Sequence, residues 1–255
     1  MKSSDILAID VGNTSIFFAH CCGNKILKTY RIPTNGFSHL DKKIFNLKNC
    51  DAAVIASVVP SATNILLKEI PKKWHLRVFL IGKDIAVPIK NKYKDPRQVG
   101  MDRLMNAVAA FNDYRRDLII VDFGTAITFD VVSKKGEYLG GVIAPGIEIS
   151  LEALFFKTAM LPKIRLAHPN RFIGQNTVES IRIGCSVGIG GLCDRIIQNI
   201  KERGFATPLV IATGGYAKFM RKYCHSIDKI DELLVIKGIL SCYEAFKKNL
   251  DKKKL

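Results

Sequence analysis

Several features that would place this 255-residue chain in a familiar class are missing. No run of 18 apolar residues occurs, so no segment has the length and hydropathy of a membrane-spanning helix. The first residues, Met-Lys-Ser-Ser-Asp, lead into a short apolar strand and lack the hydrophobic region and cleavage site of a signal peptide. We therefore expect a cytoplasmic protein without a membrane anchor.

Motifs for common kinds of site are also missing. The chain contains no Gly-x-x-x-x-Gly-Lys-Ser/Thr loop, which excludes a P-loop kinase, and no Gly-x-Gly-x-x-Gly after a strand. The five histidines have no acidic partner at a recognisable spacing, which argues against a histidine-based triad. The seven cysteines include no Cys-x-x-Cys pair and no set with zinc spacing, which indicates reduced, mostly buried thiols.

Acidic residues are few relative to basic ones. The formal net charge is +16 and the isoelectric point is near 9.6. Nucleic-acid binding is one interpretation of this excess. However, the charge is spread over many segments, and no basic stretch carries interleaved aromatic residues. We favour a solvated basic surface that attracts anionic small molecules, and we expect no nucleic-acid partner.

One short cassette occurs twice, at residues 6–16 and 118–128. In each copy an apolar run ends in Asp-x-Gly, then small hydroxyl or amide residues follow, then a second apolar run. This pattern is typical of a strand, a tight turn and a strand. Glycine allows a sharp turn and a close approach of phosphate. The following N–H groups and hydroxyls can hold phosphate oxygens, and the aspartate can hold a hydrated Mg²⁺.

A single cassette of this kind is usually only a hairpin turn, because Asp, Asn and Gly suit turns in any case. The repetition, with an aliphatic run before each copy, favours a phosphate site. It predicts two similar halves facing one nucleotide, 1–116 and 117–255. Strands followed by helices indicate an α/β fold with mixed sheets. A polar helix is expected at 36–48, a helix at 147–157, an extended segment at 158–176 and a capping box at 176–179.

Three carboxylates stand beside glycine in expected turns: Asp10, Asp102 and Asp122. Asp10 and Asp122 occupy matched hairpin bends, where carboxylates suit cation binding next to phosphates. Asp102 precedes Arg103 at the start of an expected helix. Such a pair is commonly a surface cap, but this loop is crowded with residues that a binding site would use. Hydroxyl groups follow several strands, at Thr14, Ser15, Thr125 and Thr213.

Seven motifs in this order resemble those of type III pantothenate kinases, members of the actin/sugar-kinase/heat-shock ATPase superfamily. The likeness runs nearly end to end. The motifs span residues 10–14, 57–61, 96–103, 122–126, 140–146, 174–177 and 213–215. The resemblance implies two ribonuclease-H-like (actin-like) halves, each a mixed sheet flanked by helices, with a cleft between them. It also implies ATP-dependent phosphorylation of pantothenate to 4'-phosphopantothenate, the first step towards coenzyme A.

The resemblance further implies a role for each matching residue. Asp102 is the expected general base. Asp10 acts near Mg²⁺, through water, and Asp122 is the expected ligand of a monovalent cation, K⁺ or NH₄⁺. The expected ATP and phosphate contacts are Asp10, Val11, Gly12, Asn13, Thr14, Ser15, Thr125, Thr213 and Gly214. The expected pantothenate contacts are Tyr93, Gly100, Met101, Asp102, Arg103 and Thr177.

The family implies a homodimer in which the neighbouring subunit completes the pantothenate site. Two alternatives stay open. A sugar kinase of the same fold is one, and the loop at residues 93–103 argues against it. A regulatory or nucleic-acid-binding protein that retains the fold is the other. It predicts degraded carboxylate positions, whereas Asp10, Asp102 and Asp122 are intact.

Overall fold

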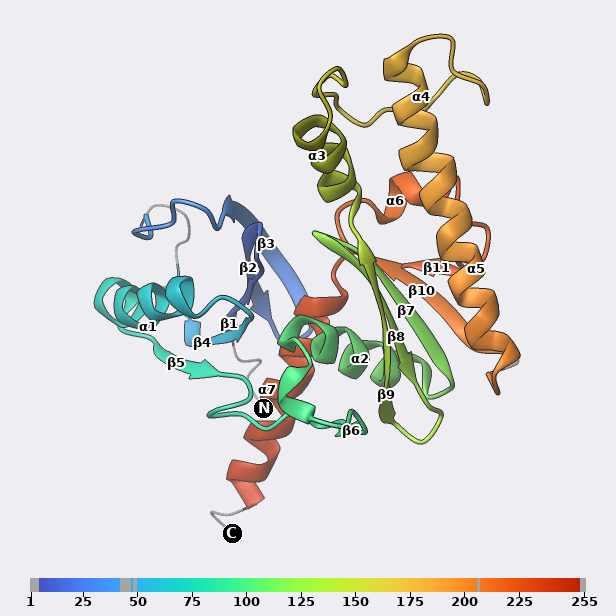
Figure 1. Ribbon diagram of the computed structural model, residues 1–255. Coiled ribbons are helices and arrows are strands. Elements are labelled where there is room, and N and C mark those ends of the chain that lie inside the picture. The colour runs from blue at the N-terminus through green and yellow to red at the C-terminus, as the bar shows by residue number, and fades with distance from the viewer. Residues whose placement is uncertain (1–4, 42–46, 48–49, 206, 253–255) are drawn as a thin grey trace. The chain divides into compact units, whose positions relative to one another are not determined.

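The computed structural model describes residues 5–41, 47, 50–205 and 207–252 (Figure 1). The chain divides into two compact units. Unit 1 comprises Met1–Tyr114 and Leu233–Leu255, and unit 2 comprises Arg115–Glu232. The division after Tyr114 lies two residues before the one expected from the sequence. The C-terminal helix, expected in the second half, groups with unit 1 instead.

Unit 1 contains a five-stranded mixed sheet with the order β3-β2-β1-β4-β5. Strands β1, β2 and β3 form an antiparallel meander, while β4 lies parallel to β1 and β5 lies parallel to β4. The bounds are Asp5–Val11 (β1), Ser15–Cys22 (β2), Lys25–Pro33 (β3), Cys50–Ser57 (β4) and Arg77–Leu80 (β5). The unit also contains α1 (Pro60–Trp74), β6 (Lys90–Asn91), η2 (Pro96–Gln98), α2 (Met101–Tyr114) and α7 (Leu234–Lys252).

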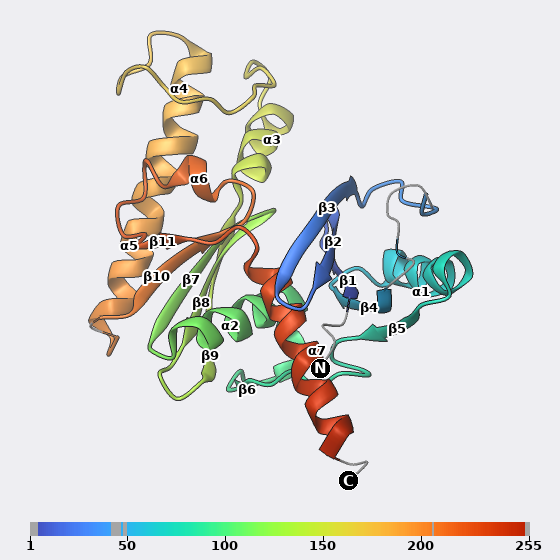
Figure 2. The ribbon, with the colours of Figure 1, turned by 180° about the vertical axis from the view of Figure 1, so that it is seen from behind.

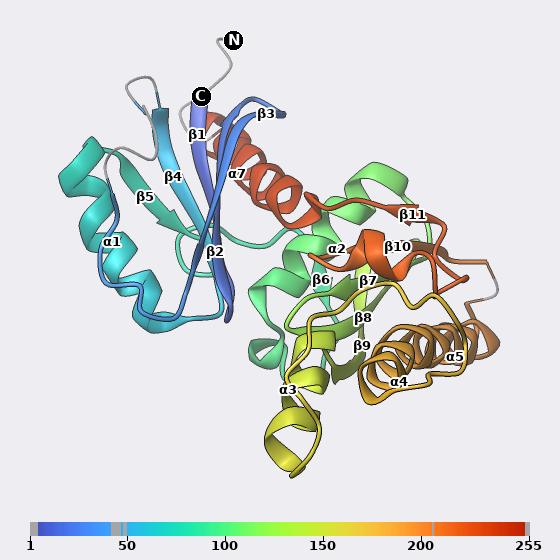
Figure 3. The ribbon, with the colours of Figure 1, turned by 90° about the horizontal axis from the view of Figure 1, so that it is seen from above.

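Helices cover both faces of this sheet (Figure 3). On one face, Leu66 and Ile70 of α1 pack against Leu7 and Ile9 of β1 in one apolar cluster. The four-residue spacing in α1 places its apolar side chains on one stripe. On the other face, α7 packs against β1 and β4. Because both faces are covered, the central strands read as nearly continuous apolar runs.

Unit 2 contains the strand order β11-β10-β7-β8-β9. Strands β7, β8 and β9 are antiparallel neighbours, whereas β10 lies parallel to β7 and β11 lies parallel to β10. The bounds are Leu118–Phe123 (β7), Ala126–Val132 (β8), Glu137–Pro145 (β9), Leu209–Thr213 (β10) and Lys229–Ile230 (β11). The helices are α3 (Ile147–Lys157), α4 (Thr177–Ile183), η3 (Gly184–Gly188), α5 (Ile189–Glu202) and α6 (Ala217–Met220).

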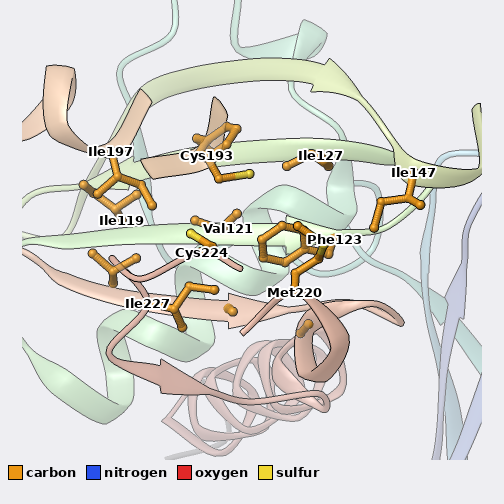
Figure 4. Packing of buried hydrophobic residues seen from close by; sticks show 14 residues of the cluster. Ile119, Val121, Phe123, Ile127, Ile147, Cys193, Ile197, Met220, Cys224 and Ile227 are labelled. Carbon is orange, nitrogen blue, oxygen red and sulfur yellow. The ribbon is translucent and has the colours of Figure 1, made fainter. Parts of the chain in front are cut away.

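The core of unit 2 lies between one face of its sheet and helices α5 and α6. Figure 4 shows Val121 and Phe123 of β7 among side chains that include Ile197 of α5 and Met220 of α6. All four are fully buried. Helix α5 runs along this face of the sheet (Figure 2). Alternate residues of β7 therefore point into this core, as the period of a strand requires.

The two sheets share one topology. In each, three antiparallel strands are followed by a fourth strand parallel to the first and a fifth parallel to the fourth. Asp10 and Asp122 are both the next-to-last residue of the first strand. The repeated cassette therefore forms equivalent hairpins, and the predicted mixed α/β halves are confirmed.

Other expectations had mixed outcomes. Helix α3 has the expected bounds, and residues 158–176 contain no helix or strand. The polar helix expected at 36–48 falls partly on residues 42–46 and 48, which lie outside the described residues, and residues 37–41 contain no helix. Within the described parts of the chain, no helix has the length and apolar character needed to cross a membrane.

Candidate active site

The first Asp-x-Gly cassette forms the turn between β1 and β2. The N–H of Gly12 donates to the carbonyl oxygen of Ser15 at 3.0 Å, which closes the turn around Asn13 and Thr14. The residue after β3 supports it, because the Thr34 hydroxyl donates to the carbonyl oxygen of Gly12 at 2.7 Å. The side chains of Asn13 and Thr14 are exposed. A fixed backbone therefore presents an amide and a hydroxyl to solvent, as a phosphate site requires.

The turn between β4 and α1 connects this hairpin with the start of α2. The N–H of Val58 donates to the carbonyl oxygen of Val11 at 3.0 Å. A Cβ atom on Gly100 would lie 3.5 Å from Cγ1 of Val58. Val58 thus contacts both the Asp10 turn and Gly100, so the structure brings together two groups of predicted site residues.

Asp102 occupies the first turn of α2 and is half-buried. Its Oδ1 accepts the N–H of Arg103 at 2.8 Å. A Cβ atom on Gly100 would overlap Oδ1, so a side chain at position 100 would displace this carboxylate. Burial raises the pKa of Asp102, and the N–H and positive charge of Arg103 offset this only in part. A carboxylate with a raised pKa is a stronger base than an exposed one.

The loop before α2 is ordered by bonds from side chains to its own backbone. Oδ1 of Asn91 accepts the N–H of Tyr93 at 2.9 Å, and Asp95 caps the short helix η2. Tyr93 is half-buried within this loop, and Met101 begins α2. Arg103 is 7% exposed. The predicted substrate residues of unit 1 therefore lie along one continuous, preorganised segment.

Three turns of unit 2 meet at Asp122. A Cβ atom on Gly124 would lie 3.2 Å from Oδ1 of Asp122, and one on Gly214 would overlap the same oxygen. Gly214 has a φ of 88°, which glycine adopts without strain. A Cβ atom on Gly146, which precedes α3, would overlap the carbonyl oxygen of Thr125. Backbone from two turns therefore packs close to one oxygen of the half-buried Asp122, and the turn at Gly146 packs on the β7–β8 turn beside it.

The other predicted residues of unit 2 divide into two groups. Thr213 pairs with Asp122 across β10 and β7 and is buried, and Thr125 is exposed in the β7–β8 turn. Thr177 lies apart from these turns, as the exposed first residue of α4. The expected capping box is present there, because Oδ1 of Asn176 accepts the N–H of Glu179 at 2.9 Å.

Asp10 and Asp122 are single carboxylates and not parts of preformed metal clusters. Among the residues that the structure describes, no group of three or more His, Cys, Asp or Glu side chains could hold a metal ion. This chemistry fits Mg²⁺ that keeps most of its water and is held by one carboxylate together with phosphate oxygens. It also fits a monovalent cation held at Asp122 by oxygen atoms.

One serine motif was not identified from the sequence, and the structure argues against a catalytic role for it. Residues 184–188 have the Gly-x-Ser-x-Gly spacing of a hydrolase nucleophile, but they form the π-helical turn η3. Ser186 is buried, and its hydroxyl donates to the carbonyl oxygen of Arg182 at 2.6 Å. A nucleophile elbow instead exposes its serine at a strand-to-helix turn.

Two further positions were not identified from the sequence. Gly238 of α7 lies against the backbone of Met105 in α2, where a Cβ atom would overlap the Met105 carbonyl oxygen. Helix α7 thereby supports the helix that carries Asp102. Asp130 of β8 is fully buried and accepts the Tyr138 hydroxyl at 2.7 Å. The only local signals were a glycine within an apolar helix and an aspartate within an apolar strand.

The family model described as type III pantothenate kinase matches residues 6–199. The chain belongs to this family. The match includes the Asp10 turn, Asp102 and Asp122. Two relatives extend the similarity over nearly the whole chain. The type III pantothenate kinase of Pelobacter propionicus is 40% identical over 250 residues, covering 94% of this chain and 98% of the relative. That of Geobacter sulfurreducens is 38% identical with the same coverage.

Solved structures outside this close group share the fold. A conserved Campylobacter jejuni protein described as a Baf family transcriptional activator has a TM-score of 0.58 and 22% identity, with 96% of this chain and 99% of that chain covered. MreB 5 of Spiroplasma citri has a TM-score of 0.51 and 12% identity, with coverage of 99% and 100%. These likenesses concern the fold alone, and they agree with the actin-like class expected for type III pantothenate kinases.

Proposed function

We propose that this chain transfers the terminal phosphoryl group of ATP to the primary hydroxyl of pantothenate, the first step of coenzyme A biosynthesis. The observation that carries the proposal is the half-buried Asp102 at the start of α2, inside the segment that matches the family. Phosphoryl transfer depends on placement and charge stabilisation more than on covalent chemistry by the protein. The two Asp-x-Gly turns and the Asp102 segment supply groups for both needs.

Asp102 acts as the general base that accepts the hydroxyl proton of pantothenate. Its raised pKa favours this role, and the N–H of Arg103 holds one of its oxygens in place. Arg103 provides a positive charge for the pantothenate carboxylate. Tyr93, Gly100, Met101 and Thr177 are proposed as further pantothenate contacts. A fixed base and a fixed cation one residue apart orient a substrate that carries a hydroxyl and a carboxylate.

ATP phosphates bind along the turn from Asp10 to Ser15, with Val11, Gly12, Asn13 and Thr14 between them. Thr125, Thr213 and Gly214 are the proposed phosphate contacts of unit 2. Asp10 holds Mg²⁺ through water, and Asp122 holds K⁺ or NH₄⁺. When bound, the cations neutralise charge on the phosphates. The exposed Asn13 and Thr14 and the close backbone at Gly124 and Gly214 support this assignment.

The protein is proposed to be a cytoplasmic homodimer. Several large apolar side chains on α3 and in residues 158–176 are exposed to solvent. A single exposed apolar residue is normal, but several of them are typical of an interaction surface. Phe156 is 70% exposed, Met160 90%, Phe172 83% and Ile173 82%. We infer that a second copy of the chain covers these side chains. Light scattering should give a dimer, and Met160→Glu combined with Phe172→Glu should give monomers. A monomeric wild type would exclude the proposal.

The deciding experiment measures ADP release from Mg-ATP with pantothenate, in K⁺ and again in Na⁺. We expect turnover that requires pantothenate and K⁺, and a panel of sugars should not replace pantothenate. Asp102→Asn should lower kcat about 10²- to 10⁴-fold, the usual contribution of a general base, while it still binds pantothenate. Near-normal turnover of Asp102→Asn would refute its role as the base. Turnover of a sugar in place of pantothenate would refute the assignment of pantothenate as the substrate.

A further inference from the structure

An arginine on the edge strand β3 lies beside the Asp10 turn. The guanidinium carbon of Arg31 is 4.5 Å from the centroid of the Phe17 ring, and Nη1 donates to the Ser15 hydroxyl oxygen at 3.1 Å. Phe17 pairs with Arg31 across β2 and β3, and with Asp10 across β1 and β2. Paired residues of adjacent strands lie on the same face of a sheet. Asp10, Phe17 and Arg31 therefore form one row on one face.

Two contacts restrict this exposed side chain. A long arginine on a surface normally samples many rotamers, and ordering it costs entropy. Here the Phe17 ring provides a platform for the guanidinium, and Ser15 accepts one of its N–H groups. Arg31 is therefore a preorganised cation at the edge of a turn whose exposed groups suit phosphate.

The direction of the Ser15 hydrogen bond has a chemical consequence. Because the Ser15 oxygen accepts a hydrogen bond from Arg31, its own O–H remains to donate to another acceptor. The guanidinium has further N–H groups in a planar fork that matches two oxygens of a phosphate. A phosphate oxygen beside this turn could thus receive donors from both side chains. Lysine would supply the charge without the fork.

We propose that Arg31 binds the β- or γ-phosphate of ATP, with Phe17 holding its guanidinium and Ser15 sharing the phosphate. The proposal rests on the proposed function, because it takes ATP as the ligand of the Asp10 turn. It adds to that turn a cation from a strand that the cassette itself does not include. The charge of Arg31 then complements the Mg²⁺ proposed at Asp10 in neutralising the polyphosphate.

The same sheet contains a matched control. On the opposite edge strand, β5, the guanidinium carbon of Arg77 is 5.9 Å from the centroid of the Phe79 ring. Arg77 pairs with Ala52, whereas Asp10 pairs with Ala56, so Arg77 lies towards the other end of the strands. Both arginines are exposed. Removing either changes the net charge equally, but only Arg31 adjoins the turn.

The experiment measures binding of Mg-ATP, Mg-ADP and AMP by calorimetry, without pantothenate, to the wild type, Arg31→Gln, Arg31→Lys and Arg77→Gln. We expect Arg31→Gln to weaken ATP binding about 10- to 100-fold, the usual loss for a hydrogen bond to a charged group. An equal loss for ADP assigns the contact to the β-phosphate, and an unchanged ADP affinity assigns it to the γ-phosphate. AMP has no β- or γ-phosphate to lose this hydrogen bond, so its binding should stay within about twofold of wild type. Arg31→Lys should be intermediate, and Arg77→Gln should match the wild type.

Phe17→Leu keeps an apolar side chain under Arg31 but removes the aromatic ring. It should weaken ATP binding by about two- to fivefold, as expected for an exposed cation–π contact. Thermal melts of each variant report folding. Should Arg31→Gln fail to fold, Arg31→Lys still tests the proposal, because it keeps the charge and loses the fork.

The outcomes separate this inference from the proposed function. Equal weakening by Arg31→Gln and Arg77→Gln, or equal weakening of AMP and ATP, would overturn the inference, since either result indicates only the general field of the surface. If the wild type binds ATP through Arg31 but does not phosphorylate pantothenate, the inference stands and the proposed function fails. If it phosphorylates pantothenate and Arg31→Gln keeps the wild-type KM for ATP, the function stands and the inference fails. A wild type that binds no ATP contradicts both.

Discussion

The two Asp-x-Gly turns occupy equivalent places in equivalent sheets, yet their surroundings differ. The turn of unit 1 has three residues between its strands, and the side chain of Thr34, directly after β3, donates a hydrogen bond to the Gly12 carbonyl oxygen. The turn of unit 2 has two residues, and glycines from two other turns, Gly146 and Gly214, pack against it. The first turn presents two exposed residues, whereas backbone from two other turns packs against the second, in which Thr125 alone is exposed.

This difference indicates that the two turns bind different ligands. An open turn with exposed Asn13 and Thr14 can accept a ligand as large as a triphosphate and its hydrated Mg²⁺. Backbone at Gly124 and Gly214 lies close to one oxygen of Asp122, so we expect a small ion rather than a triphosphate beside that oxygen. The same local sequence pattern can therefore serve two kinds of binding, because neighbouring segments decide how much space remains around it.

Replacing the two carboxylates should give the largest contrast. Asp10→Asn should lower kcat about 10²- to 10³-fold in either salt, as the loss of one group that stabilises transition-state charge does. Asp122→Asn should instead abolish the difference in kcat between K⁺ and Na⁺, while ATP binding is retained. Steady-state rates and ATP affinities in the two salts check both. An Asp122→Asn enzyme that K⁺ still stimulates would contradict the assignment of different ligands to the two turns.

Adding a methyl group to each turn tests the difference in packing. Gly146→Ala should lower the free energy of unfolding by about 1–3 kcal/mol, because the new Cβ atom overlaps the carbonyl oxygen of Thr125. Gly12→Ala should cost less, because its Cβ atom would lie 3.2 Å from the Ser15 carbonyl oxygen. Urea unfolding of both variants measures this. Equal costs would mean that the two turns are equally crowded.

Two hydrogen bonds, one in each unit, should show a smaller difference of the same kind. Tyr138→Phe removes a donor from the fully buried Asp130 and should cost about 1–3 kcal/mol. Thr34→Val removes the partly buried bond to Gly12 and should cost about 0.5–1.5 kcal/mol. Denaturant midpoints give both values. A larger cost for Thr34→Val would show that side-chain support of the open turn matters more than its exposure suggests.

The smallest effect concerns the pH dependence of stability. Because the pKa of Asp102 is raised in the folded state, its ionisation disfavours folding as pH rises through that pKa. Asp102→Asn should therefore raise Tm at pH 7, and the gain should vanish at acid pH, where Asp102 is protonated. Asp113→Asn, at the other end of α2, should show no comparable gain. A lower Tm for Asp102→Asn at pH 7 would contradict the burial argument.

The local sequence pattern was sufficient to predict those elements whose formation depends on neighbouring residues alone. Aliphatic runs ending in Asp-x-Gly predicted both hairpins, because period and turn chemistry act within a few residues. The cap at Asn176 followed from its spacing to Glu179. Helix α2 begins at Met101, directly after Gly100. A glycine in a loop-like segment did not reveal where the helix starts.

By itself, the sequence determined the two mixed α/β halves, the positions of Asp10 and Asp122 at matched bends, and the family. Contacts between distant segments decided the rest. Helix α7 joins unit 1 and packs on α2, because Gly238 lets two backbones approach, and no local pattern encodes its partner. The raised pKa of Asp102 and the placement of Arg31 over Phe17 arise in the same way. Burial and cross-strand packing depend on which segments meet, and only the tertiary structure brings them together.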